Sequence, residues 1–268
     1  MTAPSPFTLH PGTAPLLISF PHVGTHVPPA LAARLTPKAR EVHDTDWHLP
    51  RLYDFARGLG ASLLIATHSR YVIDLNRPPD GASLYPGQSV TALCPVDDFD
   101  GESIHLDVTD EPGAQEIAER RAAIWQPYHD ALAAELARIK AAQGVAVLWD
   151  AHSIRSVLPR FFDGKLPDLN LGTADGASCA PELAHELLAV AESAPGFTAV
   201  LNGRFKGGHI TRAHGRPQQG VHAVQLEMTQ SSYMQEAMPF DYLPERAARI
   251  QPTLERLLQT ALAFAQRA

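Results

Sequence analysis

Short apolar runs alternate along the chain with longer stretches in which apolar residues recur at helical spacing. Runs of strand length lie at residues 16–20, 62–67, 71–75, 145–149, 197–202 and 222–228. Helical spacing covers residues 45–59, 111–143, 180–192 and 244–266. Strands separated by helices predict an α/β fold, with a central, mostly parallel sheet and helices on both of its faces.

Proline and glycine mark the boundaries of these elements. Residues 80–108 are rich in proline, glycine and aspartate, and we expect them to form a long loop or lid. Pro78 and Pro79 prevent further strand pairing after residue 75, and Pro127 is expected to break the helix at 111–143. A chain of 268 residues buries roughly 70–75% of its unfolded surface, so residues 1–268 are expected to form a single domain.

The charge pattern limits the partners of the chain. Its net charge is −7 at pH 7, and no basic face for nucleic acid is apparent. The strongest basic cluster suits either a small anionic ligand or a solvated loop; it contains Arg204, Lys206, Arg212 and Arg216. No apolar run is long enough for a signal peptide or a membrane span, so we expect a cytoplasmic protein without a membrane partner. The pattern leaves the oligomeric state open.

Polar residues with metal-binding or acid–base chemistry stand at the ends of four predicted strands. They are His22, the pair Asn76 and Arg77, His152 and Glu227. The carboxyl ends of parallel strands meet at one edge of a sheet, where sites of α/β proteins lie. Catalytic zinc commonly takes two histidines and one carboxylate, and a further carboxylate serves as general base. The residue types therefore predict a zinc hydrolase acting on an anionic acyl-amino compound.

The third metal ligand is less clear from the pattern. A His-x-x-Glu spacing from His22 would place an acid at residue 25, which is Thr25. The nearest acids are Asp44 and Asp46, and either can be the N-cap of the following helix. We prefer Asp46 as the ligand, with Asp44, His48 and His26 as alternatives.

Six segments in order resemble one family. They are residues 21–28 (PHVGTHVP), 44–47 (DTDW), 69–78 (SRYVIDLNRP), 150–153 (DAHS), 207–212 (GGHITR) and 225–228 (QLEM). Together they look like an N-formylglutamate amidohydrolase, a family similar to the zinc carboxypeptidases. The ordered set is specific, although a single segment such as Pro-His-x-Gly-Thr is not. The match extends from residue 21 to about residue 234 and covers most of the chain.

The resemblance implies a phosphorylase/hydrolase-like three-layer fold around a mixed sheet. It also implies the zinc-dependent cleavage of N-formyl-L-glutamate to formate and L-glutamate, a step of histidine breakdown. The metal could also be cobalt or manganese. The roles it implies are metal ligation by His22 and His152, binding of the substrate carboxylates by Asn76 and Arg77, and general-base catalysis by Glu227.

Other roles rest on inference. Arg70 would stabilise the oxyanion, and Arg212 would join Arg77 at the two carboxylates of a dianionic substrate. The roles of His209 and His214 stay open. A deacylase or carboxypeptidase-like enzyme with another N-acyl substrate, and a metal-free carboxylate-binding module, are the alternative functions.

Overall fold

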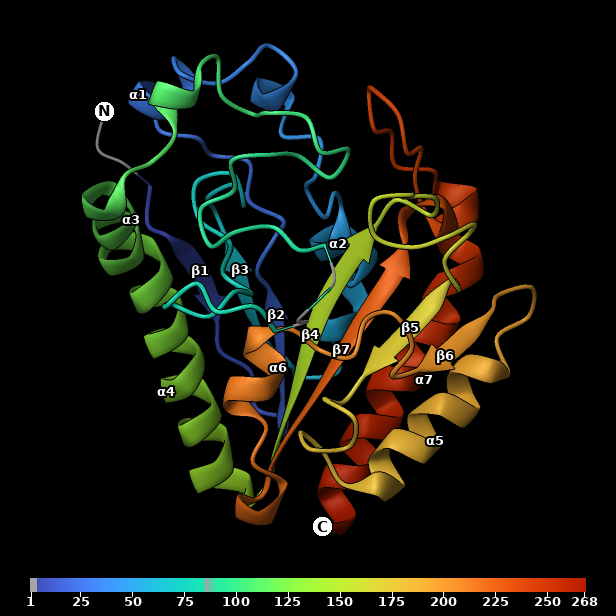
Figure 1. Cartoon of the computed structure of the whole chain (residues 1–268). Coiled ribbons are helices and arrows are strands. Elements are labelled where there is room, and N and C mark those ends of the chain that lie inside the picture. The colour runs from blue at the N-terminus through green and yellow to red at the C-terminus, as the bar shows by residue number, and fades with distance from the viewer. Residues whose placement is uncertain (1–3, 85–86, 88) are drawn as a thin grey trace.

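The chain forms an α/β fold around a seven-stranded mixed sheet (Figure 1). This computed structural model describes residues 4–84, 87 and 89–268. The strands are β1 (Phe7–His10), β2 (Leu16–Phe20), β3 (Ser62–Ala66), β4 (Ala146–Ile154), β5 (Leu169–Gly172), β6 (Ala199–Leu201) and β7 (Val221–Thr229). Their order across the sheet is β1-β3-β2-β4-β7-β5-β6.

The centre of the sheet is parallel and its margins are mixed. Strand β2 is parallel to β3 and β4, and β4 is parallel to β7. Strand β1 is antiparallel to β3, β5 is antiparallel to β7, and β6 is parallel to β5. The carboxyl ends of β2, β4 and β7 therefore lie at one edge, as the sequence predicted.

Seven helices accompany the sheet in the described part of the chain. They are α1 (Pro29–Ala32), α2 (Leu49–Leu52), α3 (Ala114–Arg120), α4 (Gln126–Gln143), α5 (Pro181–Glu192), α6 (His209–His214) and α7 (Pro244–Arg267). None of the helices in these described residues is both long and apolar enough to cross a membrane.

Apolar residues cover both faces of the sheet, which is why its central strands read as continuous apolar runs. In β2, Leu16 and Ile18 belong to the core that contains residues of α5 and α7. Leu17 points to the opposite face and belongs to the core that contains residues of α4. Figure 1 shows the same arrangement, with α4 on one side of the sheet and α5 and α7 on the other.

The strand predicted at residues 71–75 is wrong, because this buried segment is a loop. Its backbone groups bond to scattered partners instead of a neighbouring strand. Arg120 Nη1 donates to the Val72 carbonyl at 2.9 Å, and the Asp74 N–H donates to the Leu93 carbonyl at 2.7 Å. The apolar run therefore reflects burial and not strand pairing.

Two predicted helices also differ from the structure. Residues 45–59 contain only α2 and a 3₁₀ turn at Asp54–Arg57, because His48 has a φ of 63° that a right-handed helix excludes. Residues 111–143 form α3 and α4, joined by a π-helical turn at Arg121–Trp125. Pro127 does not break this helix. It lies beside the π turn, an irregularity that accommodates a proline ring.

The remaining elements agree with or extend the prediction. The predicted loop at 80–108 contains no helix or strand within its described residues, apart from the start of a 3₁₀ turn at Val108–Asp110. Strand β4 continues beyond residue 149 to Ile154, so His152 lies within the strand and not after it. Strands β1 and β5 and helices α1 and α6 were not predicted, because each has at most six residues.

Candidate active site

The carboxyl edge of the sheet brings three potential metal ligands together. His22 lies just beyond β2, and His152 lies near the end of β4. Asp46 comes from the loop after β2, where its backbone N–H donates to the His22 carbonyl at 3.0 Å. One ligand atom from each of the three buried residues lies within 4.8 Å of the other two. The sequence had predicted this set.

Carboxylates orient both histidine rings. His22 Nε2 lies 2.7 Å from Asp74 Oδ1, and His152 Nε2 lies 3.0 Å from Asp150 Oδ2. The opposite ring nitrogens face Asp46 Oδ2, with Nδ1 at 3.8 Å for His22 and 3.2 Å for His152. A proton on each Nε2 leaves both Nδ1 lone pairs directed toward the same point.

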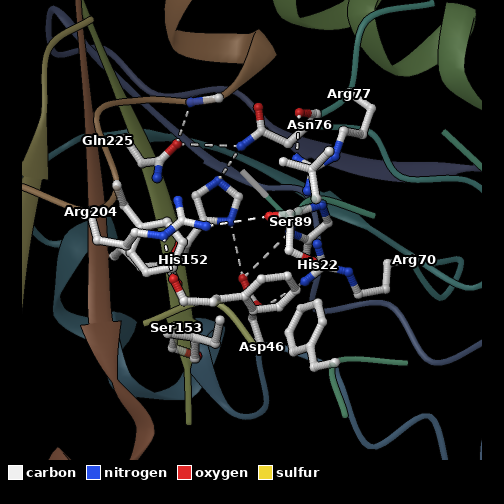
Figure 2. Close-up of a pocket in the computed structure, with 17 residues that line it drawn as sticks. His22, Asp46, Arg70, Asn76, Arg77, Ser89, His152, Ser153, Arg204 and Gln225 are labelled. Atoms are coloured by element: carbon white, nitrogen blue, oxygen red, sulfur yellow. Dashed lines mark hydrogen bonds and ion pairs between the residues drawn. The ribbon is translucent and has the colours of Figure 1, made fainter. Parts of the chain in front are cut away.

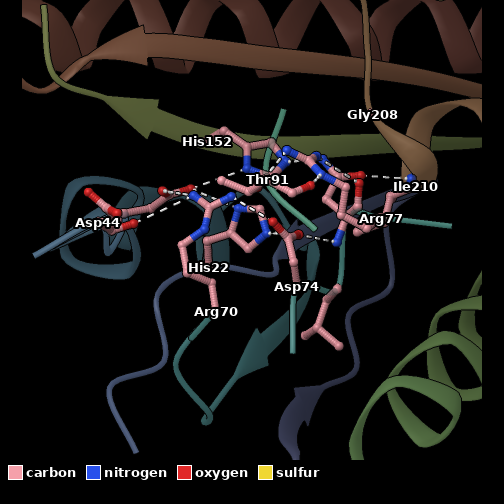
Figure 3. Close-up of polar contacts among 12 residues, drawn as sticks. His22, Asp44, Arg70, Asp74, Arg77, Thr91, His152, Gly208 and Ile210 are labelled. Carbon is pink, nitrogen blue, oxygen red and sulfur yellow. Dashed lines mark hydrogen bonds and ion pairs between the residues drawn. The ribbon is translucent and has the colours of Figure 1, made fainter. Parts of the chain in front are cut away.

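Further buried hydrogen bonds hold the two orienting carboxylates. Asp74 Oδ2 accepts from Arg70 Nη2 at 2.8 Å, and Asp74 Oδ1 accepts from the Asn76 N–H at 2.8 Å (Figure 3). Asp150 Oδ1 accepts from Ser19 Oγ at 3.1 Å, and that hydroxyl lies 3.0 Å from the Tyr128 hydroxyl. The histidines are therefore fixed by two layers of polar contacts.

The charge environment affects the two histidines differently. Burial and, after it, the positive charge of Arg70 lower the pKa of His22, which favours the neutral ring. Burial opposes a charge on His152 as well, but Asp150 and then Asp46 raise the pKa of His152 well above its ordinary value. The protonation of the pair is thus set by the surrounding carboxylates and by any cation bound among them.

Glu227 lies opposite His152 in the register of β4 and β7. Its side chain is 8% exposed and lines the same pocket as the histidines. Burial raises the pKa of Glu227 to about 8, although the charge of His152 opposes this shift. A buried carboxyl group in the same pocket as the histidines, with a pKa close to neutral pH, can exchange a proton with a molecule bound there.

The site opens into a pocket with a charged and aromatic lining (Figure 2). Three arginines contribute positive charge to the wall: Arg70, Arg77 and Arg204. Its apolar and aromatic lining consists of Val90, Phe99, Ile154, Phe161 and Phe205. The loop at 80–108 forms part of this wall through its residues Ser89, Val90 and Phe99. Such a pocket suits a small anionic molecule with an apolar portion.

Asn76 and Arg77 both line the pocket, but their contacts differ. The Asn76 amide nitrogen lies 3.0 Å from His152 Nε2, and its amide oxygen accepts from the Ile210 N–H at 2.8 Å. Arg77 Nε and Nη2 donate to the carbonyl and hydroxyl of Thr91 at 2.9 and 3.0 Å. Asn76 thus lies beside His152 and donates to Asp150 Oδ2 at 3.4 Å, while Thr91 aims the Arg77 guanidinium.

Arg212 does not lie among the residues that line the pocket. It is part of α6, and its Nε donates to the Gly207 carbonyl at 2.9 Å. Arg204, from the same basic cluster, lines the pocket instead. Sequence reasoning had chosen Arg212 from this cluster, because the arginine that reaches the pocket depends on the loop after β6 and not on the pattern of charges.

The alternative metal ligands are also placed elsewhere. Asp44 Oδ2 accepts from the Tyr71 hydroxyl at 2.7 Å and from the Phe99 N–H at 2.8 Å. His48 Nε2 lies 2.7 Å from the Phe240 carbonyl. The His26 ring instead packs edge-on against His68.

Sequence reasoning missed Asp74 and did not assign a role to Asp150. Both lie in the quoted segments 69–78 and 150–153, next to predicted site residues. Their closeness in sequence to Asn76 and His152 could therefore have identified them as candidate site residues.

His209 and His214 belong to a second histidine group, with His129 of α4. His129 Nε2 lies 2.8 Å from the Leu75 carbonyl, and its Nδ1 lies 3.3 Å from His214 Nε2. The His129 ring stacks on Trp125 with centroids 3.7 Å apart. The group adjoins the polar network at Asn76, whose carbonyl accepts from the backbone N–H of His209 at 3.3 Å.

Comparison with known proteins gives consistent similarities. A family model described as N-formylglutamate amidohydrolase matches residues 14–234. The chain is 54% identical over 253 residues to a protein of Pseudomonas aeruginosa named N-formylglutamate deformylase, with 94% of each chain covered. It is 51% identical over 257 residues to one of the same name from Pseudomonas putida, with 96% of each covered.

Solved structures share the fold. The crystal structure of an N-formylglutamate amidohydrolase from Ralstonia eutropha superposes with a TM-score of 0.78 at 26% identity, covering 98% of this chain and 99% of that one. A protein of Agrobacterium tumefaciens has a TM-score of 0.71 at 22% identity, with 96% and 94% covered, and is similar in fold alone. The predicted α/β fold and the family resemblance are confirmed.

Proposed function

The chain belongs to the N-formylglutamate amidohydrolase family, and we propose that it hydrolyses N-formyl-L-glutamate to formate and L-glutamate with a zinc ion held by His22, Asp46 and His152. One observation carries the metal assignment: two buried imidazoles present their Nδ1 atoms to one carboxylate, while their Nε2 atoms are bonded to Asp74 and Asp150.

The donor set fits zinc in composition and spacing. Zinc–nitrogen and zinc–oxygen bonds of about 2.0–2.1 Å in a tetrahedron place ligand atoms about 3.3–3.4 Å apart. The Nδ1 atoms of His152 and His22 lie 3.2 and 3.8 Å from Asp46 Oδ2, on either side of that value. A carboxylate on the remote nitrogen of each histidine is the usual support of a metal-binding imidazole.

The reaction needs a nucleophile, a base and a site for the developing negative charge. Zinc bound at this site would supply a Lewis acid and a source of hydroxide near neutral pH. Glu227 accepts the proton of the attacking water and passes it to the amide nitrogen. The new C–O bond forms at the formyl carbon, the C–N bond breaks, and the products formate and L-glutamate leave.

Arg70 supplies a fixed positive charge beside the reacting group. Its guanidinium is held by Asp74 Oδ2 at 2.8 Å and lies 4.6 Å from the centroid of the Phe99 ring. A cation fixed in a buried position stabilises the oxyanion that forms on the formyl oxygen without rearranging during the reaction. Arg77, aimed by Thr91, binds a substrate carboxylate.

Elemental analysis combined with a formate-release assay tests this proposal. We expect about one zinc per chain, loss of formate release after chelation and recovery on adding zinc. Release from N-formylglutamate should exceed release of the acyl group from the N-acetyl and N-succinyl analogues. Full activity in metal-free protein would exclude the metal role, and a preference for another acyl group would exclude the proposed substrate.

A further inference from the structure

Arg204 forms part of the pocket wall, in the segment that follows β6. Its Nε donates to the Phe161 carbonyl at 2.6 Å, and its Nη2 lies 3.4 Å from the Ser89 carbonyl. The guanidinium carbon lies 5.2 Å from the centroid of the Phe205 ring. These carbonyl and ring contacts orient the guanidinium in the pocket wall (Figure 2).

Arg77 and Arg204 line the same pocket but are anchored to different segments of its wall. Arg77 follows Asn76, whose amide nitrogen lies 3.0 Å from His152 Nε2. Arg204 is anchored instead to Phe161 and Ser89, which belong to two other segments of the pocket lining. Arg77 is therefore held by the segment that contacts His152, and Arg204 by different segments of the wall.

The substrate has two carboxylates that also differ in their distance from the reacting group. The α-carboxylate is attached to the carbon that bears the formamide nitrogen, whereas two methylene groups separate the side-chain carboxylate from that carbon. With the formyl carbon at the histidines, the nearer α-carboxylate is the natural partner of Arg77, whose neighbour Asn76 contacts His152. The longer arm extends along the aromatic wall toward Arg204, and its methylene groups can pack against Phe205.

We propose that Arg204, and not Arg212, binds the side-chain carboxylate and makes the enzyme selective for a dicarboxylic substrate, while Arg77 binds the α-carboxylate. The proposal rests on the proposed function, because it takes N-formylglutamate as the substrate. Arg212 is instead a structural residue of α6, bonded to the Gly207 carbonyl at 2.9 Å.

Three substrates test the two carboxylates one at a time. N-formyl-L-glutamate has both, N-formyl-L-glutamine lacks the side-chain carboxylate, and the α-amide N-formyl-L-isoglutamine lacks the α-carboxylate. For Arg204→Met we expect kcat/KM for the glutamate substrate to fall by about 30-fold or more, as is typical when a desolvated charge pair loses one partner. Its kcat/KM for the glutamine substrate should change by less than about threefold. Arg204→Met should still prefer N-formyl-L-glutamate over the α-amide. Arg204→Lys should recover only part of the loss, because lysine has no planar fork.

Arg249→Met is the matched control. Arg249 also stacks on a phenylalanine, with its guanidinium carbon 5.8 Å from the Phe197 centroid, but it is not among the pocket-lining residues. Arg249→Met should leave kcat/KM for all three substrates unchanged. The proposal is overturned if Arg204→Met keeps the preference for glutamate over glutamine, or if it lowers all three values equally. Loss of that preference in Arg212→Met alone would also overturn it.

Failure of the proposed function has a different signature. In that case the wild-type holoenzyme would release no formate from N-formylglutamate. Calorimetric binding of N-formylglutamate and N-formylglutamine to the wild type and Arg204→Met then tests the arginine alone. Weaker binding of only the dianion by the variant supports the assignment, and equal affinities in both proteins refute it.

Discussion

Two histidine groups meet at Asn76, and they differ in what surrounds them. His22 and His152 have ring centroids 4.9 Å apart, and each ring bonds to a carboxylate. His129 and His214 are stacked with centroids 5.6 Å apart, and their described contacts are with rings and a backbone carbonyl. The same side chain therefore serves two purposes within one network.

The neighbours, and not the residue type, decide which purpose applies. Burial lowers the pKa of His129 to about 3 and the pKa of His214 to about 4, and each histidine's neighbouring histidines add to this shift. At the active site the carboxylates act in the opposite direction on His152. A histidine group in which burial outweighs the nearby carboxylates stays neutral and packs as an aromatic cluster, whereas one in direct contact with carboxylates can hold a cation.

The largest expected effect is the loss of either metal-facing histidine. His22→Ala or His152→Ala should remove the bound metal and lower kcat/KM by more than the roughly 100-fold that losing an outer-shell partner costs. His209→Ala, in the other group, should retain the metal. Metal content and formate release measured on the same samples check this. Equal losses of metal and activity from substitutions in both histidine groups would contradict this contrast between the groups.

Glu227→Gln should give the next largest effect. The change preserves the shape of the side chain but removes its ability to accept a proton, so kcat should fall by roughly 10²–10⁴-fold. The Michaelis constant should change much less, because arginines bind the carboxylates. Steady-state kinetics and metal analysis decide the role. Loss of metal in the variant would make Glu227 a ligand, and normal turnover would place the base elsewhere.

Asp150→Asn sharpens the comparison by removing the charge that orients His152. Loss of a carboxylate behind a metal-binding histidine typically weakens metal affinity by about 10–100-fold. Competition with a chromogenic chelator measures that affinity. The control is Asp130→Asn, at an exposed position of α4 where Asp130 Oδ1 accepts from Gln126 Nε2 at 2.8 Å. Equal zinc affinity in all three proteins would contradict the orienting role.

The smallest effect concerns the aromatic histidine group and pH. The pKa of His129 is lower in the folded protein than in the unfolded chain, so the unfolded chain takes up more protons below about pH 6.5. Stability from the neutral ring is present above that pH and is lost as the pH falls, by up to about 2 kcal/mol at pH 5. His129→Gln should therefore reduce the loss of Tm between pH 7 and 5.

The matched variant for this measurement is His185→Gln, at an exposed position of α5. Differential scanning calorimetry of the two variants and the wild type at both pH values gives the comparison. If His129→Gln and His185→Gln show the same dependence of Tm on pH, the buried ring makes no special contribution.

Much of the central sheet was predictable from apolar runs. Residues 16–20 form β2 as expected, and residues 222–228 lie within β7. Both strands are covered on two faces, so their sequences are rich in apolar residues and easy to recognise. The run at 71–75 is equally apolar but forms a loop, since side chains such as Arg120 bond its backbone. Burial and strand pairing cannot be separated by hydrophobicity alone.

The candidate site was predictable where chemistry follows a strand. His22, His152 and Glu227 stand at or near the ends of recognisable strands. Asp46 could be preferred but not separated from Asp44, because both stand at the start of the same predicted helix. Their separation depends on the loop conformation, which directs Asp44 to the Tyr71 hydroxyl and Asp46 to the histidines.

The sequence by itself determined the α/β order of elements, the family and the residue types that meet at the carboxyl edge, because these follow from local periodicity and short motifs. Only the tertiary structure decided which ring nitrogen of each histidine faces Asp46, and which arginine of the basic cluster reaches the pocket. The contact between His22 and Asp74 spans 52 residues, and that between His152 and Asp46 spans 106. Contacts between residues so far apart in the chain are set by the packing of loops from separate strands, which no local pattern encodes.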